Sequence, residues 1–348
     1  MIDNIVNSGL TSVGIRGCFR QTHSAVWDVT LDQLDFVPVA YSHAEINYQL
    51  SYLQSGIECQ DISLILYHDN GPCGIWPLCY MQNDGVGTLG SYLDNGRSLL
   101  PPLFVSGMAD KTKKSITRKC LDFVEIICKD SGVEKWQSAE SYIGRVGLSE
   151  WHEQSLQRGA TASLRHELFV DLTLDMVTIK AKIRKSFKSL ITEGMRTWKV
   201  GVLNGANPEL WESFRMLHQK AAGRVTRSIE TWDLQYQAIV SRHAFLVHLH
   251  NDESELVGGG YFAVTRDQGV YNVGAYDRNL FDHPLGHVVQ YRAIEEMKAR
   301  GLRWYKIGFR CYPQDDGVNE KEVSISEFKQ GFATHLIPQY VLQTELKS

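Results

Sequence analysis

The sequence predicts an α+β fold in which one arrangement is built twice, as two mixed sheets flanked by helices. The chain has 348 residues, enough for two domains of ordinary size. Each half contains two apolar runs joined by a polar turn, which is typical of an antiparallel hairpin. In each half a helix precedes this hairpin, and a strand, an amphipathic helix and a further strand follow it. We therefore expect two domains, at residues 1–170 and 171–348.

In the first half, residues 42–52 are expected to form a helix. The stretch "DISLILYHDNGPCGIWPLCYMQND" then reads as a hairpin with its turn at residues 69–72, and "LLPPLFVSG" as the next strand. In "KTKKSITRKCLDFVEIICKD" apolar residues recur three and four positions apart, which predicts an amphipathic helix. The strand "VEKWQSAES" completes the series.

In the second half, residues 209–220 and 232–241 are expected helices. The hairpin is "AFLVHLHNDESELVGGGYFAVTRD", and "GVYNVGAYD" is the next strand. "PLGHVVQYRAIEEMKARG" predicts a helix that ends before Gly301, and "LRWYKIG" is the strand after it. The same order of elements therefore occurs in both halves.

The stretch "SISEFKQGFATHLIP", residues 324–338, predicts the end of a sheet. Polar and apolar residues alternate over 324–326 and in part over 334–337, as in short strands. Between them Lys329 lies beside two phenylalanines, and Gly331 permits a turn that a residue with a Cβ would resist.

Composition restricts the classes of function. The net charge of -4 argues against a general nucleic-acid-binding protein, although a local basic patch is compatible with it. The seven scattered cysteines indicate reduced thiols in a cytoplasmic protein, without a disulfide frame or a zinc site. No secretory signal is expected at the start, and no stretch approaches the roughly 18 apolar residues of a membrane span.

Three stretches of the second half carry a family resemblance. "KIRKSFKSLITEG", "GLRWYKIGF" and "EFKQGF", in this order, resemble the Fem-type (FemAB) aminoacyltransferases and the related acetyltransferase-like (GNAT) proteins of cell-surface polysaccharide pathways. The resemblance covers mainly residues 170–338. It implies a tandem duplicated GNAT-like fold, and an enzyme that moves an acyl or aminoacyl group onto an amine. No long heptad run matches the coiled-coil arm of some Fem enzymes.

A GNAT-like site lets an amine attack a bound thioester or ester directly, and by analogy it lies at the end of "YNVGAYD". Strand alternation places Tyr271 and Asp277 on one face, and Gly274 and Tyr276 on the other. Asp277, His283 and Tyr276 are the candidate catalytic residues, because acid–base groups beside this turn can take the proton of the amine. The alternative for each is an ordinary polar loop residue or sheet tyrosine.

The resemblance also implies a donor site. Acetyl-CoA users of the superfamily commonly carry Q/R-x-x-G-x-G/A before the long helix, whose N-terminus holds the pyrophosphate. In "HPLGHV", Gly286 matches the first glycine, whereas His283 and Val288 depart from the pattern. Gly286 and His287 are therefore candidate cofactor-binding residues, with acyl-CoA as the first donor and aminoacyl-tRNA, the donor of Fem enzymes, as the second. A catalytically silent GNAT-like binding module is the alternative to an enzyme.

Phosphate binding is the role that the resemblance implies for Lys329, the lysine of F-K-x-G-F. Arg310 and Arg224 are expected to share the charge, and Tyr271 to line the substrate site. The expected acceptor is a small phosphorylated molecule, such as a sugar nucleotide or a cell-envelope precursor.

Basic residues also crowd residues 180–199. Two interpretations of this segment are open. Arg184 and Lys188 can meet the phosphates of a tRNA or a nucleotide sugar, or they belong to a solvated helix face. His248 and His250 share one face of a strand, but no third ligand is spaced to join them, so no metal site is expected.

Overall fold

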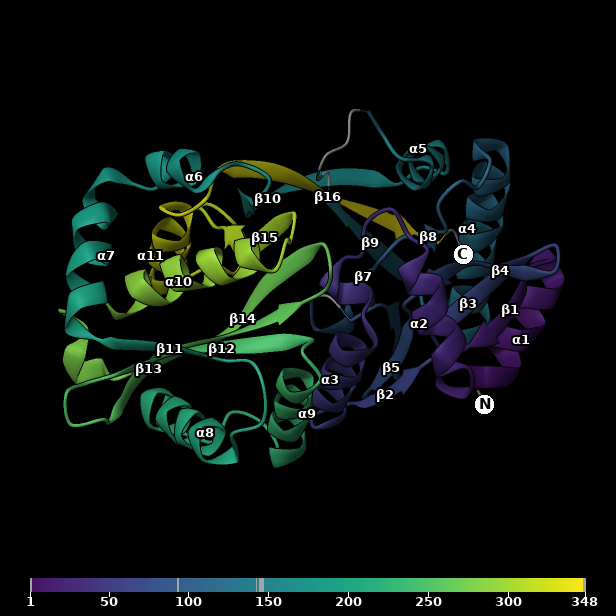
Figure 1. Cartoon of the computed structure of the whole chain (residues 1–348). Coiled ribbons are helices and arrows are strands. Elements are labelled where there is room, and N and C mark those ends of the chain that lie inside the picture. Colours follow the sequence, from purple (N-terminus) through teal and green to yellow (C-terminus); the bar gives the residue numbers. More distant parts are fainter. Residues whose placement is uncertain (1, 93, 142, 144–146, 347–348) are drawn as a thin grey trace. The chain divides into compact units, whose positions relative to one another are not determined.

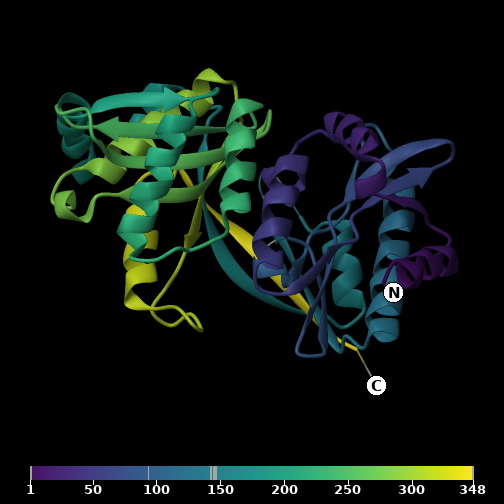
Figure 2. The ribbon, with the colours of Figure 1, turned by 90° about the horizontal axis from the view of Figure 1, so that it is seen from below.

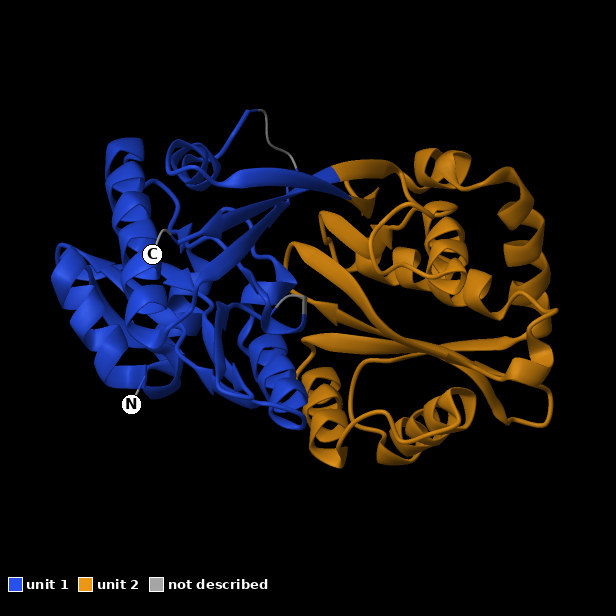
Figure 3. Cartoon of the chain, turned by 180° about the vertical axis from the view of Figure 1, so that it is seen from behind, with its two compact units in different colours: residues 1–165, 338–348 blue, residues 166–337 orange. Residues whose placement is uncertain are grey.

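The computed structural model divides into two compact units (Figure 3). Unit 1 comprises residues 1–165 and 338–348, and unit 2 comprises residues 166–337. The structure describes residues 2–92, 94–141, 143 and 147–346. Two strands, β10 (Thr161–Asp171) and β16 (His335–Glu345), carry the chain from one unit into the other. The last residues, 338–348, thus belong to unit 1, whereas the division expected from the sequence places all of residues 171–348 in the second domain.

Unit 1 combines helices with short antiparallel strands (Figure 1). Its helices are α1 (Ile2–Val13), α2 (Ser24–Asp32), α3 (His43–Gln54), α4 (Asp110–Ser131) and α5 (Glu150–Gln157). Its strands are β1 (Arg16–Phe19), β2 (Glu58–Asp61), β3 (Leu64–His68), β4 (Gly71–Trp76), β5 (Cys79–Asn83), β6 (Val86–Gly90), β7 (Ser98–Leu99), β8 (Leu103–Phe104) and β9 (Lys135–Ser141). Single turns of 3₁₀-helix are η1 (Arg20–Thr22), η2 (Val39–Tyr41) and η3 (Asp94–Gly96).

The pairing in unit 1 follows the expected hairpin. β3 and β4 are antiparallel neighbours in the order β1-β3-β4-β8, and β2, β5 and β6 form a second sheet. β7 runs parallel to β9, and α4 lies between these two strands in the sequence. The amphipathic helix expected from three- and four-residue spacing is α4, which buries Ile116, Cys120, Val124 and Ile127.

Unit 2 contains a mixed sheet with helices on both of its faces. Its helices are α6 (Met176–Lys182), α7 (Lys185–Thr197), α8 (Pro208–Ala222), α9 (Ile229–Val240), α10 (Leu285–Ala299) and α11 (Glu320–Gln330), with the 3₁₀ turn η4 (Arg278–Leu280). Its further strands are β11 (Lys199–Leu203), β12 (Ala244–His250), β13 (Leu256–Val264), β14 (Gln268–Tyr276) and β15 (Trp304–Arg310). Within this unit the strand order is β11-β12-β13-β14-β15-β10, and only β14 and β15 pair in parallel.

Two adjacent glycines of β13 show how the layers pack. A Cβ on Gly259 would lie 3.1 Å from the ring of Phe214 in α8, whereas a Cβ on Gly260 would lie 2.7 Å from Val289 in α10. Because neighbouring strand residues face opposite sides, α8 and α10 cover opposite faces of the sheet. Figure 1 shows α10 on one face and α8 with α9 on the other, and Figure 2 shows α8 and α9 in front of the strands. The glycines let both helices approach the sheet closely.

One local prediction places a helix start too early, and another is wrong. The basic stretch "KIRKSFKSLITEG", residues 182–194, is the helix α7 only from Lys185 onward, because Lys182 ends α6 and Ile183 and Arg184 are extended, with ψ of 137° and 130°. The N–H of Arg184 donates instead to the carbonyl of Gly331 at 2.8 Å. Residues 324–326 lie in α11 rather than in a strand. A capping box between Asn319 and Glu322 starts this helix, and three alternating residues are too few to oppose it.

Candidate functional site

The parallel strands β14 and β15 part from each other after three residues. Their register covers only residues 268–270 of β14 and 304–306 of β15. Each strand nevertheless stays paired with its outer neighbour, as Tyr276 with Gly258 of β13 and Arg310 with His166 of β10. The inner edges of residues 271–276 and 307–310 therefore form a fork that has its closed end at the last parallel pair.

Bulges occur in both strands where the fork opens. The pairing of β14 with β13 skips Asn272, and the pairing of β15 with β10 skips Ile307. A bulge bends its strand and increases the local twist, so two bulges at the same level turn the strands apart. An extra residue also reverses the side-chain alternation beyond it.

The predicted alternation in β14 is therefore wrong. Tyr271 and Tyr276 do not lie on opposite faces, because the bulge at Asn272 brings their hydroxyl oxygens to 3.2 Å. Gly274 shares this face, since a Cβ there would lie 1.9 Å from the Tyr271 hydroxyl. Both tyrosines and the glycine line the side of the fork that faces α10.

Two further polar residues lie near these tyrosines, Tyr305 on β15 and Gln290 on α10. The hydroxyl of Tyr305 donates to Oε1 of Gln290 at 2.5 Å, and Gln290 is fully buried. In the described part of the chain, Nε2 of Gln290 has no hydrogen-bond partner. Burial raises the pKa of Tyr271, Tyr276 and Tyr305, so their hydroxyls remain protonated donors at neutral pH.

Lys329 lies at the fork and not at a sheet edge. From the last turn of α11, its ammonium group approaches to 5.5 Å from the centre of the Tyr271 ring. Its Nζ would be 3.0 Å from a Cβ on Gly308, so this glycine makes room for the lysine. Among the described residues the ammonium has no carboxylate partner, and burial lowers the pKa of Lys329.

Gly331 is required for space rather than for a turn. Its φ of −61° is helical, but a Cβ would lie 2.2 Å from the ring of Phe187. The expected turn is present at residues 331–332, but its helical backbone does not require a glycine, so the reason expected from the sequence is wrong. His287 lies in the same aromatic cluster, with ring centres 4.5 Å from Phe187 and 5.0 Å from Phe328. Burial lowers the pKa of His287 to about 4, so the imidazole is neutral at pH 7.

The N-terminus of α10 follows the open end of the fork. The N–H groups of Leu285 and Val288 donate to the carbonyls of His283 and Pro284 at 2.9 and 3.2 Å. Over the described residues, the N–H groups of Gly286 and His287 find no acceptor. A Cβ on Gly286 would lie 3.1 Å from Phe328 and 3.8 Å from Tyr276. The candidate cofactor-binding glycine is therefore next to the fork.

The three candidate catalytic residues have different surroundings. Asp277 accepts a hydrogen bond from the N–H of Asn279 and pairs with Lys220, both at 3.0 Å, and these two contacts lower its pKa. His283 is exposed, with its ring centre 5.8 Å from that of Trp198. In the described structure no hydrogen bond joins Tyr276 to Asp277 or His283. Only Tyr276 lines the fork.

Two of the predicted substrate-binding arginines hold α11. Arg310 pairs with Glu327 at 3.0 Å and donates to Ser326 at 2.9 Å. Arg184 donates to the carbonyl of Glu327 at 2.8 Å, a favourable contact at a helix C-terminus. Both therefore position the helix that carries Lys329. Arg224 is exposed in the loop between α8 and α9, and no contact among the described residues joins it to the fork.

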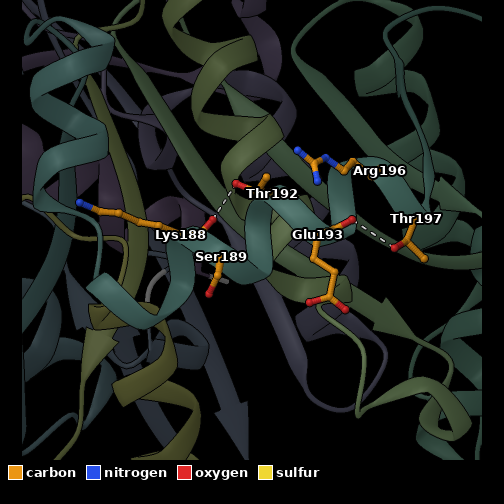
Figure 4. A pocket seen from close by; sticks show the side chains of 6 residues that line it. All are labelled: Lys188, Ser189, Thr192, Glu193, Arg196 and Thr197. Atoms are coloured by element: carbon orange, nitrogen blue, oxygen red, sulfur yellow. Dashed lines mark hydrogen bonds between the residues drawn. The ribbon is translucent and has the colours of Figure 1, made fainter.

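A shallow groove of about 650 Å³ follows α7 (Figure 4). Its lining is Lys188, Ser189, Thr192, Glu193, Arg196 and Thr197. Lys188 donates to the carbonyl of Ala181 at 3.2 Å. Within the described residues, neither Lys185, Lys188 nor Arg196 forms an ion pair with a carboxylate, so this face of α7 keeps a net positive charge although it also carries Glu193.

Sequence reasoning missed Gln290, Tyr305 and Gly308. Gln290 had a usable signal, because it is a polar residue beside the apolar stripe of the helix expected at 285–300. Gly308 had a weaker one, since an isolated glycine in a strand often marks a bulge or a close approach.

His248 and His250 lie next to each other on β12. Nδ1 of His248 lies 3.3 Å from Nδ1 of His250. No set of three or more His, Cys, Asp or Glu side chains in the described ranges is grouped to hold a metal ion. No helix among the described residues combines the length and apolarity that crossing a membrane requires.

Comparisons with known proteins identify a related domain and related folds. Residues 179–313 match the family model of an acetyltransferase (GNAT) domain. The structure of FemX superposes with a TM-score of 0.64 at 12% identity, covering 95% of this chain and 97% of that one. L-PGS from Bacillus licheniformis gives a TM-score of 0.60 at 11% identity, covering 93% and 92%. No curated protein matches by sequence.

A further structure is similar over most of its length. The C-terminal domain of a provisionally assigned lysylphosphatidylglycerol synthetase from Agrobacterium fabrum has a TM-score of 0.58 at 12% identity, covering 92% of this chain and 90% of that one. The chain therefore has a tandem GNAT fold like that of the Fem-like proteins, as the sequence predicted. Its matched domain is of the acyltransferase class, which confirms the predicted resemblance and class of enzyme.

Proposed function

We propose that unit 2 transfers an acyl group from a thioester or ester donor to an amine, with the reaction at the fork between β14 and β15. The parting of these two strands beside the start of α10 is the observation that carries the proposal. The amine nitrogen forms a bond to the carbonyl carbon, and the bond from that carbon to sulfur or oxygen breaks. One proton leaves the nitrogen, and one is bound by the leaving group. The fork supplies orientation and hydrogen-bond donors.

Residue roles follow from the surroundings described above. The protonated hydroxyl of Tyr276 is the proposed proton donor to the leaving group. Asp277 and His283 are the two proposed acceptors of the amine proton, and the lowered pKa makes Asp277 the weaker base. Tyr271 lines the substrate site. The two units, 1–165 with 338–348 and 166–337, correspond in this proposal to the two GNAT-like domains.

Acyl-CoA is the first proposed donor. The N–H groups of Gly286 and His287 are free to bind phosphate at the N-terminus of α10, whose first turn has no acidic residue. Calorimetry with acetyl-CoA tests this donor. Gly286→Val should weaken binding, because the new side chain would meet Phe328, whereas Gly205→Val, in open space, should not. A folded Gly286→Val protein with native affinity would contradict this donor site.

Aminoacyl-tRNA is the second candidate donor, and a different observation favours it. The face of α7 that carries Lys185, Lys188 and Arg196 has basic side chains without carboxylate partners, and the fold is shared with FemX and L-PGS. Binding should then weaken steeply as salt rises. Lys185→Glu should reduce affinity, whereas Lys111→Glu on α4, an equal change of charge, should not. Affinity that is indifferent to salt and to Lys185→Glu would exclude this use of α7.

The proposed acceptor is an amine on a small phosphorylated molecule, such as a sugar nucleotide or an envelope precursor, in the cytoplasm. Lys329 supports this proposal, because a half-buried ammonium without a counter-ion among the described residues favours an anionic ligand. Arg310, Arg184, Arg224 and Lys188 are secondary candidates for the same phosphate. A catalytically silent binding module would bind the donor without turnover, so single-turnover transfer to a panel of amino-sugar nucleotides separates the two.

A further inference from the structure

Gln290 is the most unusual polar residue of the fork, and the inference drawn from it rests on the proposed acyl transfer. Its side chain is fully buried in α10, where a polar group without a partner is costly. The hydrogen bond from Tyr305 occupies Oε1 and fixes the orientation of the amide. Nε2, which carries two N–H donors, is left without a partner among the described residues. The native structure thus holds an unused donor in its interior.

Register shows where this donor lies along the fork. The last parallel pair is Val270 with Lys306, and Tyr305, the partner of Gln290, precedes that pair. Tyr271 is the first residue beyond it, and the Gln290 side chain is close enough to act on the pKa of the Tyr271 hydroxyl, which burial raises. Tyr276 and the start of α10 lie at the open end. An acyl group that enters the fork at its open end, beside the start of α10, therefore points its distal end toward Gln290.

Donors dominate the polar groups near this closed end. Tyr271 and Tyr276 contribute protonated hydroxyls, Gln290 contributes Nε2, and Lys329 contributes an ammonium group over the Tyr271 ring. Apart from the ring faces and hydroxyl oxygens, none of these groups accepts a hydrogen bond, and none is an anion. The cluster is therefore complementary to a hydrogen-bond acceptor with negative charge, and it opposes a cationic group.

We propose that the closed end of the fork selects acyl groups that carry a carboxylate, and that Gln290 is the specificity-determining residue that binds this carboxylate. An acyl group of this kind can arrive on a dicarboxylic thioester or on an acidic aminoacyl ester, which present the same chemistry to Gln290. A simple alkyl acyl group leaves Nε2 without a partner, and a basic aminoacyl group meets Lys329. Gln290 binds the part that is transferred, whereas the phosphate of the acceptor remains assigned to Lys329.

Calorimetry on the full chain with two donor pairs tests the proposal. The first pair is succinyl-CoA and butyryl-CoA, which have four-carbon acyl groups with and without a carboxylate. The second pair is aspartyl-tRNA and leucyl-tRNA. In the pair that binds, we expect the carboxylate-bearing donor to bind tighter by a factor on the order of 10 to 100, the range of a charge-assisted hydrogen bond. The pair that binds identifies the source of the carboxylate.

Gln290→Leu removes the donor at nearly constant volume and should reduce this preference about tenfold or more, with the affinity for the neutral donor unchanged. Gln237→Leu, on the exposed face of α9, is the matched control and should keep the native preference. If Gln290→Leu does not fold, Tyr276→Phe keeps the ring, removes one hydroxyl donor and should reduce the same preference.

Equal affinity for both members of the pair that binds, or a native preference in folded Gln290→Leu, overturns this inference and leaves the proposed acyl transfer intact. Absence of binding by both pairs overturns the proposed donor site and the inference together.

Discussion

In each unit, a long helix lies in the sequence between two parallel strands: α4 between β7 and β9 in unit 1, and α10 between β14 and β15 in unit 2. The two pairs of strands differ in which groups surround them. In unit 2, β14 and β15 part and leave the fork. In unit 1, β7 is two residues long and pairs with β9 only through Ser98 and Leu99. Beyond it, the carbonyls of Leu100 and Pro101 accept hydrogen bonds from Trp76 and Tyr41 at 2.7 and 2.6 Å. Buried side chains therefore occupy acceptors beyond β7.

The packing around these strands is also denser in unit 1 than in unit 2. In unit 1 the ring centre of Trp76 lies 5.8 Å from that of Phe123 and 5.8 Å from that of Trp151, and all three residues are buried. In unit 2 the corresponding region has Gly274 and Gly308, with no side chains, beside half-buried tyrosines. Large aromatic residues fill space and stabilise a core, whereas glycines and hydroxyls leave room and hydrogen-bonding capacity for a ligand.

The long helices also begin differently. α4 has Asp110 in its first turn, which neutralises the positive helix end, whereas the first turn of α10 has no acidic residue. Of these two helices, α10 is the one whose positive end has no acidic residue in its first turn. The comparison teaches that the same order of elements can build a packed scaffold in one unit and, in the other, leave the space and free donors that the proposed reaction site needs.

The largest effect should come from breaking the scaffold of unit 1. Arg20 and Asp61 form a buried ion pair at 2.6 Å, and Tyr92 and the N–H of Ser63 donate to the same carboxylate. Asp61→Ala leaves Arg20 charged and buried, so the free energy of unfolding should fall by about 3–5 kcal/mol in urea titrations. Asp277→Ala, which breaks an exposed pair in unit 2, should change it by less than ~1 kcal/mol. Similar losses of unfolding free energy in both variants would contradict the distinction between a packed scaffold in unit 1 and an exposed ion pair in unit 2.

The next effect should fall on activity and not on stability. Lys329→Met keeps the apolar stem and removes the charge, so kcat/KM for a phosphorylated acceptor should fall by about 10- to 150-fold, which corresponds to roughly 1.5–3 kcal/mol. The melting temperature should be unchanged or higher, because the ammonium is desolvated without a counter-ion among the described residues.

The pH dependence of stability gives this variant a second readout. Because burial lowers the folded-state pKa of Lys329, the unfolded chain binds more protons between that pKa and about 10.4, and stability rises with pH across this window. The rise should disappear in Lys329→Met. Lys321→Met, at an exposed position of α11, is the control. Native kinetics in Lys329→Met would return this residue to a packing role.

A smaller effect should appear in acid. The pKa values of His248 and His287 in unit 2 are lowered to about 4 by burial. Between pH 6.5 and 4 the unfolded chain therefore binds protons that the folded chain does not, and stability falls as the pH decreases. Each residue should contribute about 1 kcal/mol after solvent screening. His287→Phe should flatten this decline in melting temperature, and a decline that stays as steep would refute the assignment to His287.

The smallest effect on stability should be that of Asp277→Asn. The Lys220 partner is 66% exposed, so the loss should stay within ~1 kcal/mol in thermal unfolding. The transfer rate should fall by less than about tenfold, since a carboxylate with a lowered pKa is a weak base. A decrease of a hundredfold at an unchanged melting temperature would instead establish the catalytic role that the sequence predicts for Asp277.

Much of this protein could be predicted from its sequence, because the signals involved are local. Three- and four-residue spacing locates α4 and α10, and Gly301, with φ of +79°, follows the end of α10 as expected. Both hairpins follow from apolar runs around polar turns. The duplicated order and the three family stretches then predicted the tandem GNAT fold and the class of enzyme.

Only the tertiary structure decided the site. A bulge at Asn272 brings Tyr271 and Tyr276 together, and such a bulge depends on pairing with β13, which alternation along one strand does not report. Burial of Lys329 and Gln290 depends on contacts between α10, α11 and the fork, which are distant in sequence. The space around Gly331 is likewise set by Phe187, more than a hundred positions away. Periodicity is a property of neighbours along the chain, whereas burial, charge compensation and free hydrogen-bonding capacity are properties of neighbours in space.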